Sequence, residues 1–542
     1  GGQRISGCTN ETEATVTTKY ERKFNSENAA VVDQEHLGGV IGQCEGSIVD
    51  CTNRGTVDQA SDPRTVNAGG ICGFVRNAAE SLSGNANEGE VRIGGAVTLA
   101  TVGGVYGSFG KAQTVADAAT TNRGGVTVSG IESIEGAYLR LGGIVGFAYP
   151  GTVLSNLTNA GDMTVDLQSK FSYYAVGGIA GSVECGASSC VNEGSLRLNN
   201  NQLLTKGMCK IFVGGIVGIN YRPTDDGPHI YEDCANRAEI GFATTDNAFK
   251  VLPSFTGGIL GYTEHPVEVR NCEGAAYINV NNANAKENGI FTATGGIVGA
   301  VKGTAALIEK CHVTADMRHY QYNNTWDDPL SAANGGGIVG CALGADEANR
   351  IAITGCSCSG MVESKRSGAA GIVGYARFSD ISDCGFTGGI EGSGPHFAGG
   401  IAGTLANSTI AGCTVKAKNI YGHNASSPSL IGVSGIAAYV VGVSSVSDCK
   451  AYATLIRNST VLGTEDASVT PDNLFGMGMI VGIDAGTTTV TNCGVGGSFY
   501  LGASEKPQEL ILTLDADSYA KGIIGSGKTA TVGGCYYWNG EK

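Results

Sequence analysis

The sequence predicts an all-β fold: a right-handed parallel β-helix, or solenoid, of about fourteen coils. Three observations support this. A five-residue glycine motif returns along most of the 542 residues, each copy is followed by a segment that usually ends in cysteine, and 86 glycines accompany a composition that is 42% hydrophobic and only 16% charged. Repeats of about 20 to 50 residues predict stacked coils, because one repeat cannot bury its own apolar face.

The first half of each repeat reads Gly-Gly-Ile-Val-Gly or a close variant. The fourteen copies begin at residues 38, 69, 103, 142, 177, 214, 257, 295, 336, 370, 399, 434, 478 and 521. The aliphatic residues favour a short strand, and the glycines permit positive φ and close approach of neighbouring coils. We expect the central isoleucines to stack as one buried ladder: Ile144, Ile179, Ile216, Ile259, Ile297 and Ile338.

The second half of each repeat is a short apolar segment that ends at a cysteine. Twelve of the 18 cysteines hold this place: Cys8, Cys51, Cys190, Cys234, Cys272, Cys311, Cys356, Cys384, Cys413, Cys449, Cys493 and Cys535. Where cysteine is missing, the position is assigned to Ala86, Thr120 or Leu157, which indicates a small buried slot. Although many cysteines in an exported chain ordinarily suggest disulfides, one per coil in one inward slot favours buried thiols.

The other cysteines leave two alternatives open. Cys185 and Cys209 could form a disulfide, although nothing in the sequence requires it. Cys356 and Cys358 are close enough in sequence to share a metal, but no second Cys or His pair completes a zinc site. We therefore predict no metal and no cofactor.

A third segment, such as 161–165 or 194–198, alternates apolar and polar residues and completes a coil of about three strands. A recurring asparagine predicts an amide ladder at a turn: Asn53, Asn122, Asn159, Asn192 and Asn236. Insertions follow this third segment, at 199–212, 281–294, 318–335 and 457–476. Insertions at one corner of a solenoid project from one edge, which is the usual recognition surface.

Residues 1–37 are expected to form a partial N-terminal coil with a cap, because 5–16 match only the cysteine half, and 38–542 to form the β-helix. The abrupt start suggests a trimmed, mature protein. The most apolar stretch, 430–446, is interrupted by Gly and Ser, so the chain is expected to lie at a surface rather than span a membrane.

Two motifs suggest nucleotide binding but belong to the repeat. Residues 522–529 fit G-x-x-x-x-G-K-[ST] and 335–340 fit G-x-G-x-x-G, yet both overlap copies of the glycine motif, and strand-forming residues rather than a helix follow 529. The net charge of −15 and the lack of basic clusters argue against nucleic acid. We expect neither nucleotide nor nucleic acid as a partner.

The glycine motif with its cysteine half resembles the GLUG repeat of bacterial secreted and cell-surface proteins, including adhesin-like and immunoglobulin A protease-like proteins. The resemblance covers the chain from about Gly38 to its end. It implies an exported solenoid of the extracellular space or the outer cell surface with a surface or adhesive role, and it brings no catalytic residues.

One insertion carries the side chains that sugar rings require, flat apolar faces beside acceptors: Tyr320, Tyr322, Trp326, Asp327 and Asp328. The alternative is that Trp326 packs on the coil beneath and the aspartates form a solvated turn. Carboxylate pairs suited to hydrolase or lyase chemistry are Asp225 with Asp226, Asp327 with Asp328, and Asp380 with Asp383, although each also fits a surface turn.

The predicted function is a non-catalytic stalk or adhesin that presents loops to a glycan or a host surface protein. Two alternatives remain: a carbohydrate-active β-helix enzyme, either polysaccharide lyase or glycoside hydrolase, and an accessory region of a secreted protease. The seven histidines show no catalytic pattern. An enzyme predicts a groove with a carboxylate cluster, whereas an adhesin predicts an aromatic-rich edge.

Overall fold

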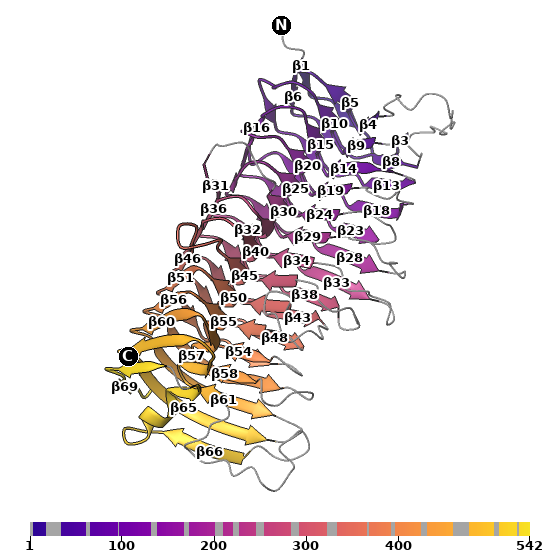
Figure 1. The fold of residues 1–542 in the computed structure, drawn as a ribbon. Helices are drawn as coiled ribbons and strands as arrows, with labels where there is room; N and C mark the ends of the chain where they lie inside the picture. The colour runs from indigo at the N-terminus through magenta and orange to yellow at the C-terminus, as the bar shows by residue number, and fades with distance from the viewer. Residues whose placement is uncertain are drawn as a thin grey trace, which may run out of the picture. The chain divides into compact units, whose positions relative to one another are not determined.

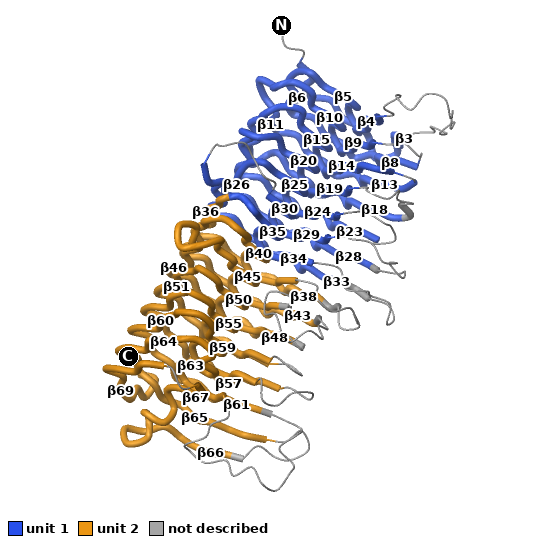
Figure 2. Tube along the Cα trace, in the orientation of Figure 1, with its two compact units in different colours: residues 1–265 blue, residues 266–542 orange. Residues whose placement is uncertain are grey.

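A computed structural model describes most of the chain as short strands in two compact units (Figures 1 and 2). The described residues are 4–17, 34–60, 65–95, 97–131, 138–166, 173–200, 210–220, 227–244, 254–282, 292–321, 333–365, 368–391, 396–423, 431–458, 476–502, 509–527 and 530–541. Unit 1 covers Gly1–His265 and unit 2 covers Pro266–Lys542. Each unit is a stack of parallel coils, as predicted for a parallel β-helix.

One coil of unit 1 shows the common plan. It contains β19 (Tyr138–Gly142), β20 (Val145–Ala148), β21 (Val153–Ser155), β22 (Thr158–Asn159) and β23 (Met163–Asp166). The prediction of about three strands is therefore wrong, because this coil has five. The glycine pair bends the first predicted strand into two, and a turn at the asparagine separates the two-residue β22 from β23.

Successive coils pair in parallel and in register. The next coil begins with β24 (Tyr173–Gly177) and β25 (Ala180–Val183), which align Gly177 with Gly142 and Ala180 with Val145. Within the ranges that the structure describes, the strands equivalent to β20 number fourteen, as the motif count predicted. In unit 1 the others are β5 (Ile41–Cys44), β10 (Cys72–Val75), β15 (Tyr106–Phe109), β30 (Val217–Asn220) and β35 (Leu260–Thr263), and in unit 2 they are β40 (Val298–Lys302), β45 (Val339–Leu343), β50 (Val373–Arg377), β55 (Ala402–Ala406), β59 (Ala437–Val441), β63 (Val481–Asp484) and β67 (Ile524–Ser526).

The three glycines of the motif lie where backbone meets backbone. A Cβ on Gly142 would lie 2.0 Å from the Val145 carbonyl oxygen, and one on Gly146 would lie 2.5 Å from the Val102 nitrogen. A Cβ on Gly143 would lie 2.0 Å from the Gly178 oxygen and 2.3 Å from Cγ of Asn159. No side chain fits at these positions. Glycine is therefore required by the sharp bend and by the close stacking of coils.

The residue before the ladder cysteine has a left-handed backbone, which the sequence analysis did not recognise. Positive φ occurs at Asp50, Asn156, Ser189, Asp233, Asn271, Lys310, Asp383, Asp448 and Asn492, and at Gly7, Gly84, Gly355, Gly412 and Gly534. Gly, Asn and Asp tolerate this conformation best. The frequent Asp-Cys, Asn-Cys and Gly-Cys dipeptides therefore mark a tight turn.

The cysteine and isoleucine ladders are confirmed within each unit. In unit 2, Cys272 to Cys493 are at most 1% exposed, and Ile144, Ile179, Ile216 and Ile259 of unit 1 are fully buried. None of the described cysteines forms a disulfide, and Cys209, the possible partner of Cys185, lies outside the described residues. One assignment was wrong: Ala86 pairs with Thr52, so Asn85, not Ala86, lies opposite Cys51. Asn85 is buried, and the cost of burying its amide is offset because Oδ1 accepts from the Cys51 amide (3.1 Å) and Nδ2 donates to the Tyr106 hydroxyl (2.7 Å).

The asparagine ladder is confirmed and belongs to unit 1. Each Nδ2 donates to Oδ1 of the next coil at 2.7–2.9 Å through Asn10, Asn53, Asn87, Asn122, Asn159, Asn192 and Asn236. In unit 2 the slot is apolar or glycine, as the register places Gly274, Val313, Cys358, Phe386 and Val415 there. The two units thus use different chemistry at the same turn.

The first and last described coils differ from the rest. Strands β1 (Arg4–Ser6), β2 (Thr9–Asn10) and β3 (Thr15–Thr17) form only the cysteine half of a coil. In unit 2, β66 (Glu509–Leu514) pairs antiparallel with β65 (Gly494–Gly502). The motif at 522–529 begins at the end of the short 3₁₀ helix Tyr519–Gly522 and continues into β67, which pairs in parallel with β63, so it is a copy of the repeat.

Across the described part of the chain, no helix has the length and apolarity that a membrane crossing requires.

Candidate functional site

Several of the longer connections leave the coils at one corner, after the strand equivalent to β23, although 221–228 follow β30 at another corner. Residues 167–172 lie between β23 and β24, and in unit 2 residues 366–367 and 459–476 lie between the equivalent strands. The predicted insertion begins at this corner. Tyr320 lies on β43 (Met317–Gln321), whereas Tyr322, Trp326, Asp327 and Asp328 lie outside the described residues.

A group of side chains around Arg318, here named the Arg318 cluster, lies on the outer face of β43 and its neighbouring strands. It comprises Tyr277, Arg318, Tyr320 and Glu363. Tyr277 precedes β38 (Ile278–Asn282), Arg318 and Tyr320 lie on β43, and Glu363 lies on β48 (Val362–Lys365). The register aligns Arg318 with Glu363, so alternation of inward and outward residues places both side chains outward on neighbouring coils.

Contacts within the Arg318 cluster hold the guanidinium group between rings and a carboxylate. Nε of Arg318 donates to Oε2 of Glu363 at 2.7 Å, and the hydroxyl of Tyr320 donates to Oε1 of Glu363. The guanidinium carbon lies 5.0 Å from the Tyr320 ring centre and 6.0 Å from that of Tyr277. The hydrogen bond to Glu363 raises the pKa of Arg318 further, and burial, with that carboxylate, raises the pKa of Tyr320 to about 12.

A shallow pocket of about 320 Å³ opens beside this cluster. Its walls are Tyr277, Asp316, Met317, Arg318, Met361 and Glu363. Oδ1 of Asp316 accepts from the Met361 amide at 2.8 Å, which ties the wall to the next coil. The pocket therefore combines an aromatic ring, guanidinium donors and carboxylate acceptors.

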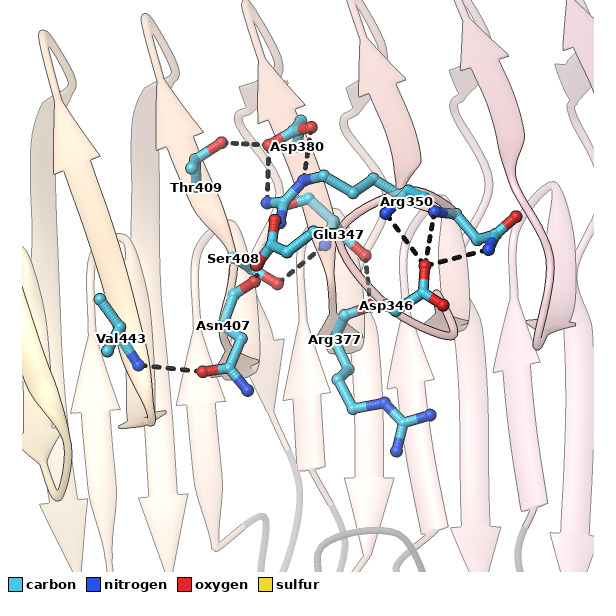
Figure 3. Close-up of polar contacts among 12 residues, drawn as sticks. Asp346, Glu347, Arg350, Arg377, Asp380, Asn407, Ser408, Thr409 and Val443 are labelled. Atoms are coloured by element: carbon cyan, nitrogen blue, oxygen red, sulfur yellow. Dashed lines mark hydrogen bonds and ion pairs between the residues drawn. The ribbon is translucent and has the colours of Figure 1, made fainter.

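A second polar cluster in unit 2 is centred on Arg350 (Figure 3). Arg350 forms a bidentate pair with Asp380 at 2.8 Å for both bonds and donates to Glu347 at 2.6 Å. It also donates to the carbonyl oxygens of Ser379 and Asn407. All five N–H donors are thus used within the protein, which makes Arg350 a clamp between coils rather than a site for a ligand.

The same cluster determines the environment of one predicted carboxylate pair. The hydrogen bond from Arg350 lowers the pKa of Asp380, and Oδ1 of Asp380 also accepts from Thr409 at 2.6 Å. Asp383 instead occupies the left-handed turn before Cys384 and is exposed. The two carboxylates serve the fold in different ways. Asp225, Asp226, Asp327 and Asp328 lie outside the described residues.

Histidines gather only once among the described residues, which sequence spacing did not indicate. His229 and His265 of unit 1 have ring centres 4.5 Å apart. Nε2 of His265 lies 2.8 Å from the Gly227 oxygen, and burial lowers its pKa. In unit 2, His319 points inward, lies 2.8 Å from Oγ1 of Thr294, and has its pKa lowered to about 4 by burial.

Unit 1 has a pocket of about 520 Å³ with mainly backbone and aliphatic walls. Gly186 lies between Val153 and Ile230, which are 47% and 44% exposed, so the missing side chain leaves a notch. Glu184 lines one side, and burial raises the pKa of its carboxyl group. The wall offers one carboxyl group and the His229 imidazole but no Tyr, Trp, Phe or Arg side chain, so this pocket has less recognition chemistry for a sugar than the Arg318 cluster.

Tyr277, Arg318 and Glu363 were not singled out from the sequence, although Arg318 lies two residues from Tyr320. Their signal is visible only after coils are aligned, because Arg318 and Glu363 are 45 residues apart and adjacent in space. An alignment based on the cysteine ladder would have placed them side by side.

The described chain is a parallel β-helix with a polar, aromatic pocket at one edge of unit 2. Comparisons with protein families, with curated proteins and with solved structures find no match. No group of three or more His, Cys, Asp or Glu side chains suited to a metal ion occurs among the residues that the structure describes.

Proposed function

We propose that this chain is a non-catalytic, exported surface protein that recognises a glycan at the insertion edge of unit 2. The pocket beside the Arg318 cluster is the observation that carries the proposal, because it lies on the strand from which the 322–332 connection leaves. The resemblance to GLUG repeats is consistent with an exported, adhesive role.

The chemistry of the pocket suits a sugar ring. Tyr277 offers a flat apolar face, and Arg318 uses only Nε in hydrogen bonds to described residues, which leaves two terminal nitrogens for vicinal hydroxyl groups. Asp316 uses one oxygen for the Met361 amide and retains acceptor capacity for hydroxyl donors.

The charge of the pocket favours a neutral sugar over an acidic one. Arg318 is the only cation in its wall, and Glu363 and Asp316 outnumber it. The Glu363 carboxylate already neutralises the guanidinium at 2.7 Å, so an incoming carboxylate or sulfate would meet a net negative wall. A hexose or other uncharged glycan avoids this repulsion.

The test is an array of neutral, sialylated and sulfated glycans probed with residues 1–542. We expect binding to neutral glycans that Tyr277→Ala weakens at least about tenfold, equivalent to about 1.4 kcal/mol. Trp326→Ala tests the predicted insertion directly. Tyr149→Ala is the matched control, because Tyr149 is 42% exposed and belongs to unit 1.

Three results would overturn the proposal: no glycan bound, binding restricted to acidic glycans, or binding unchanged in Tyr277→Ala. A parallel screen for polysaccharide cleavage tests the enzyme alternative. Reproducible cleavage by the unmodified chain would make the carbohydrate-active enzyme the better assignment.

A further inference from the structure

Among the described cysteines of the ladder, Cys8 in unit 1 and Cys535 in unit 2 are more accessible than the cysteines stacked on them. We propose that Cys8 with Cys51 in unit 1, and Cys493 with Cys535 in unit 2, are sites of oxidative modification. Each pair closes into a disulfide when the protein meets a small-molecule disulfide, and the interior thiols stay reduced.

Register places both pairs directly opposite each other. Thr9 pairs with Thr52 and Gly494 pairs with Tyr536, so the preceding residues, all cysteines, are also neighbours. Parallel strands lie about 4.8 Å apart, which falls within the range of about 4.4–6.8 Å between the Cα atoms of a disulfide. Neither pair needs a change of register to react.

Accessibility separates the end pairs from the interior of the ladder. Cys8 is exposed and Cys535 is half-buried, whereas their partners Cys51 and Cys493 are fully buried. The interior members in unit 2, from Cys272 to Cys449, are at most 1% exposed. A reagent in solution therefore reaches only the outer thiol of each end pair, since attack requires an accessible thiolate.

Freedom to move also favours the end pairs. Cβ atoms of neighbouring strands must approach from about 4.8 Å to about 3.8 Å to form the bond. Among described strands, β2 pairs only with β7 (Thr52–Asn53), and β69 (Tyr536–Tyr537) pairs only with β65. An interior strand such as β47 (Ser357–Cys358) is held on both sides, by β42 (His312–Val313) and β52 (Gly385–Phe386).

The reaction is a pair of thiol–disulfide exchanges. The thiolate of Cys535 attacks one sulfur of the reagent, forms a mixed disulfide and releases one reagent thiolate. Cys493 then loses its proton and attacks the Cys535 sulfur, which releases the second reagent thiolate. Two protein thiols are oxidised by two electrons, and one reagent disulfide is reduced to two thiols. Cys8 and Cys51 react in the same way.

The experiment treats folded residues 1–542 with oxidised glutathione and measures intact mass and disulfide-linked peptides. We expect the loss of four hydrogen atoms in all and two linked peptides, Cys8–Cys51 and Cys493–Cys535. Cys8→Ser and Cys535→Ser should each remove one link, and both substitutions lie at the more accessible positions of the ladder. Cys384→Ser, in the interior, should leave both links in place.

A second measurement follows from the cross-link itself. Hydrogen exchange of 536–537 should slow after oxidation, because the last strand is then tied to β65 by a covalent bond. Stable glutathione adducts on Cys8 or Cys535, no reaction at all, or equal oxidation of Cys356 and Cys384 would each overturn the proposal.

Discussion

The asparagine ladder of unit 1 permits a direct test of how much one buried amide stabilises the stack. Asn122 is fully buried and makes three hydrogen bonds. Its Nδ2 donates to Oδ1 of Asn159 at 2.8 Å and to the Gly124 oxygen at 3.0 Å, and its Oδ1 accepts from Asn87 at 2.8 Å. We predict that Asn122→Ala is among the most destabilising single substitutions in the unit.

The magnitude follows from those three bonds. Each contributes about 1 kcal/mol net, and a buried partner left unsatisfied costs about 1–3 kcal/mol. In the variant, Asn87 retains its bond to the Gly89 oxygen, and Oδ1 of Asn159 loses its 2.8 Å donor from Asn122 and retains only the 3.3 Å bond from the Gly161 amide. The expected loss of stability is about 3–5 kcal/mol.

Local hydrogen exchange is the suitable assay, because a repeat array need not unfold in one step. Amides of 121–131 and 158–166 should lose protection by the predicted amount, while those of unit 2 should not change. Val313→Ala provides the comparison at the equivalent apolar slot, where only packing is lost. A loss below about 1 kcal/mol in Asn122→Ala would refute the reasoning, because the ladder would then be no stronger than solvent-exposed hydrogen bonds.

Three further predictions concern unit 2. Arg350→Ala should lower the free energy of unfolding in urea by about 1 kcal/mol. The value is modest because the Asp380 side chain is 47% exposed and water screens its ion pair with Arg350. A loss above about 3 kcal/mol would contradict this screening. The folded-state pKa of His319, about 4, lies below the unfolded value of about 6.5. The neutral imidazole therefore contributes to stability above pH 6.5, and about 3 kcal/mol of the free energy of unfolding is lost as the pH falls toward 4. His319→Gln should remove this part of the pH dependence, and an unchanged profile of stability against pH would contradict the assignment. Lys310→Asn should raise stability by about 0.5–1 kcal/mol, because Lys310 has φ 51° and Asn tolerates this left-handed backbone better than Lys. Asn271 and Gly355 occupy the equivalent turn in the neighbouring coils. A lower midpoint of urea unfolding in the variant would contradict the idea of strain at this turn.

The ladders were predictable from sequence because stacking makes chemically similar residues recur at one place. The pairing of Gly142 with Gly177, and the burial of Ile144 and Ile179, follow from the spacing of the motif alone. Strand number was not predictable in the same way. The bend at the glycine pair depends on close approach of backbone, where an added Cβ would lie only 2.0–2.5 Å from backbone atoms. An apolar run of four residues looks like one strand until that approach is seen.

The slot at Ala86 was misassigned for a related reason. A small apolar residue seemed the natural substitute for cysteine, whereas Gly84, with φ 66°, places Asn85 after the left-handed turn. Had the left-handed residue been recognised in the Asp-Cys and Asn-Cys dipeptides, the register would have followed. The candidate site was predictable only in its location, since Tyr277 and Glu363 join Arg318 through stacking of coils and not through any local motif.

Because all hydrogen bonds of the amide ladder run in the same direction along the stack, one coil can be removed or added without reversing any of them. Each interior asparagine donates from Nδ2 to the asparagine of the next coil and accepts at Oδ1 from the asparagine of the preceding coil. All interior members of the amide ladder are therefore equivalent to their neighbours. Deleting residues 122–158 would bring Asn159 up against Asn87, with the same atoms meeting at the splice. Removing or adding a complete turn of unit 1 therefore leaves the amide ladder continuous.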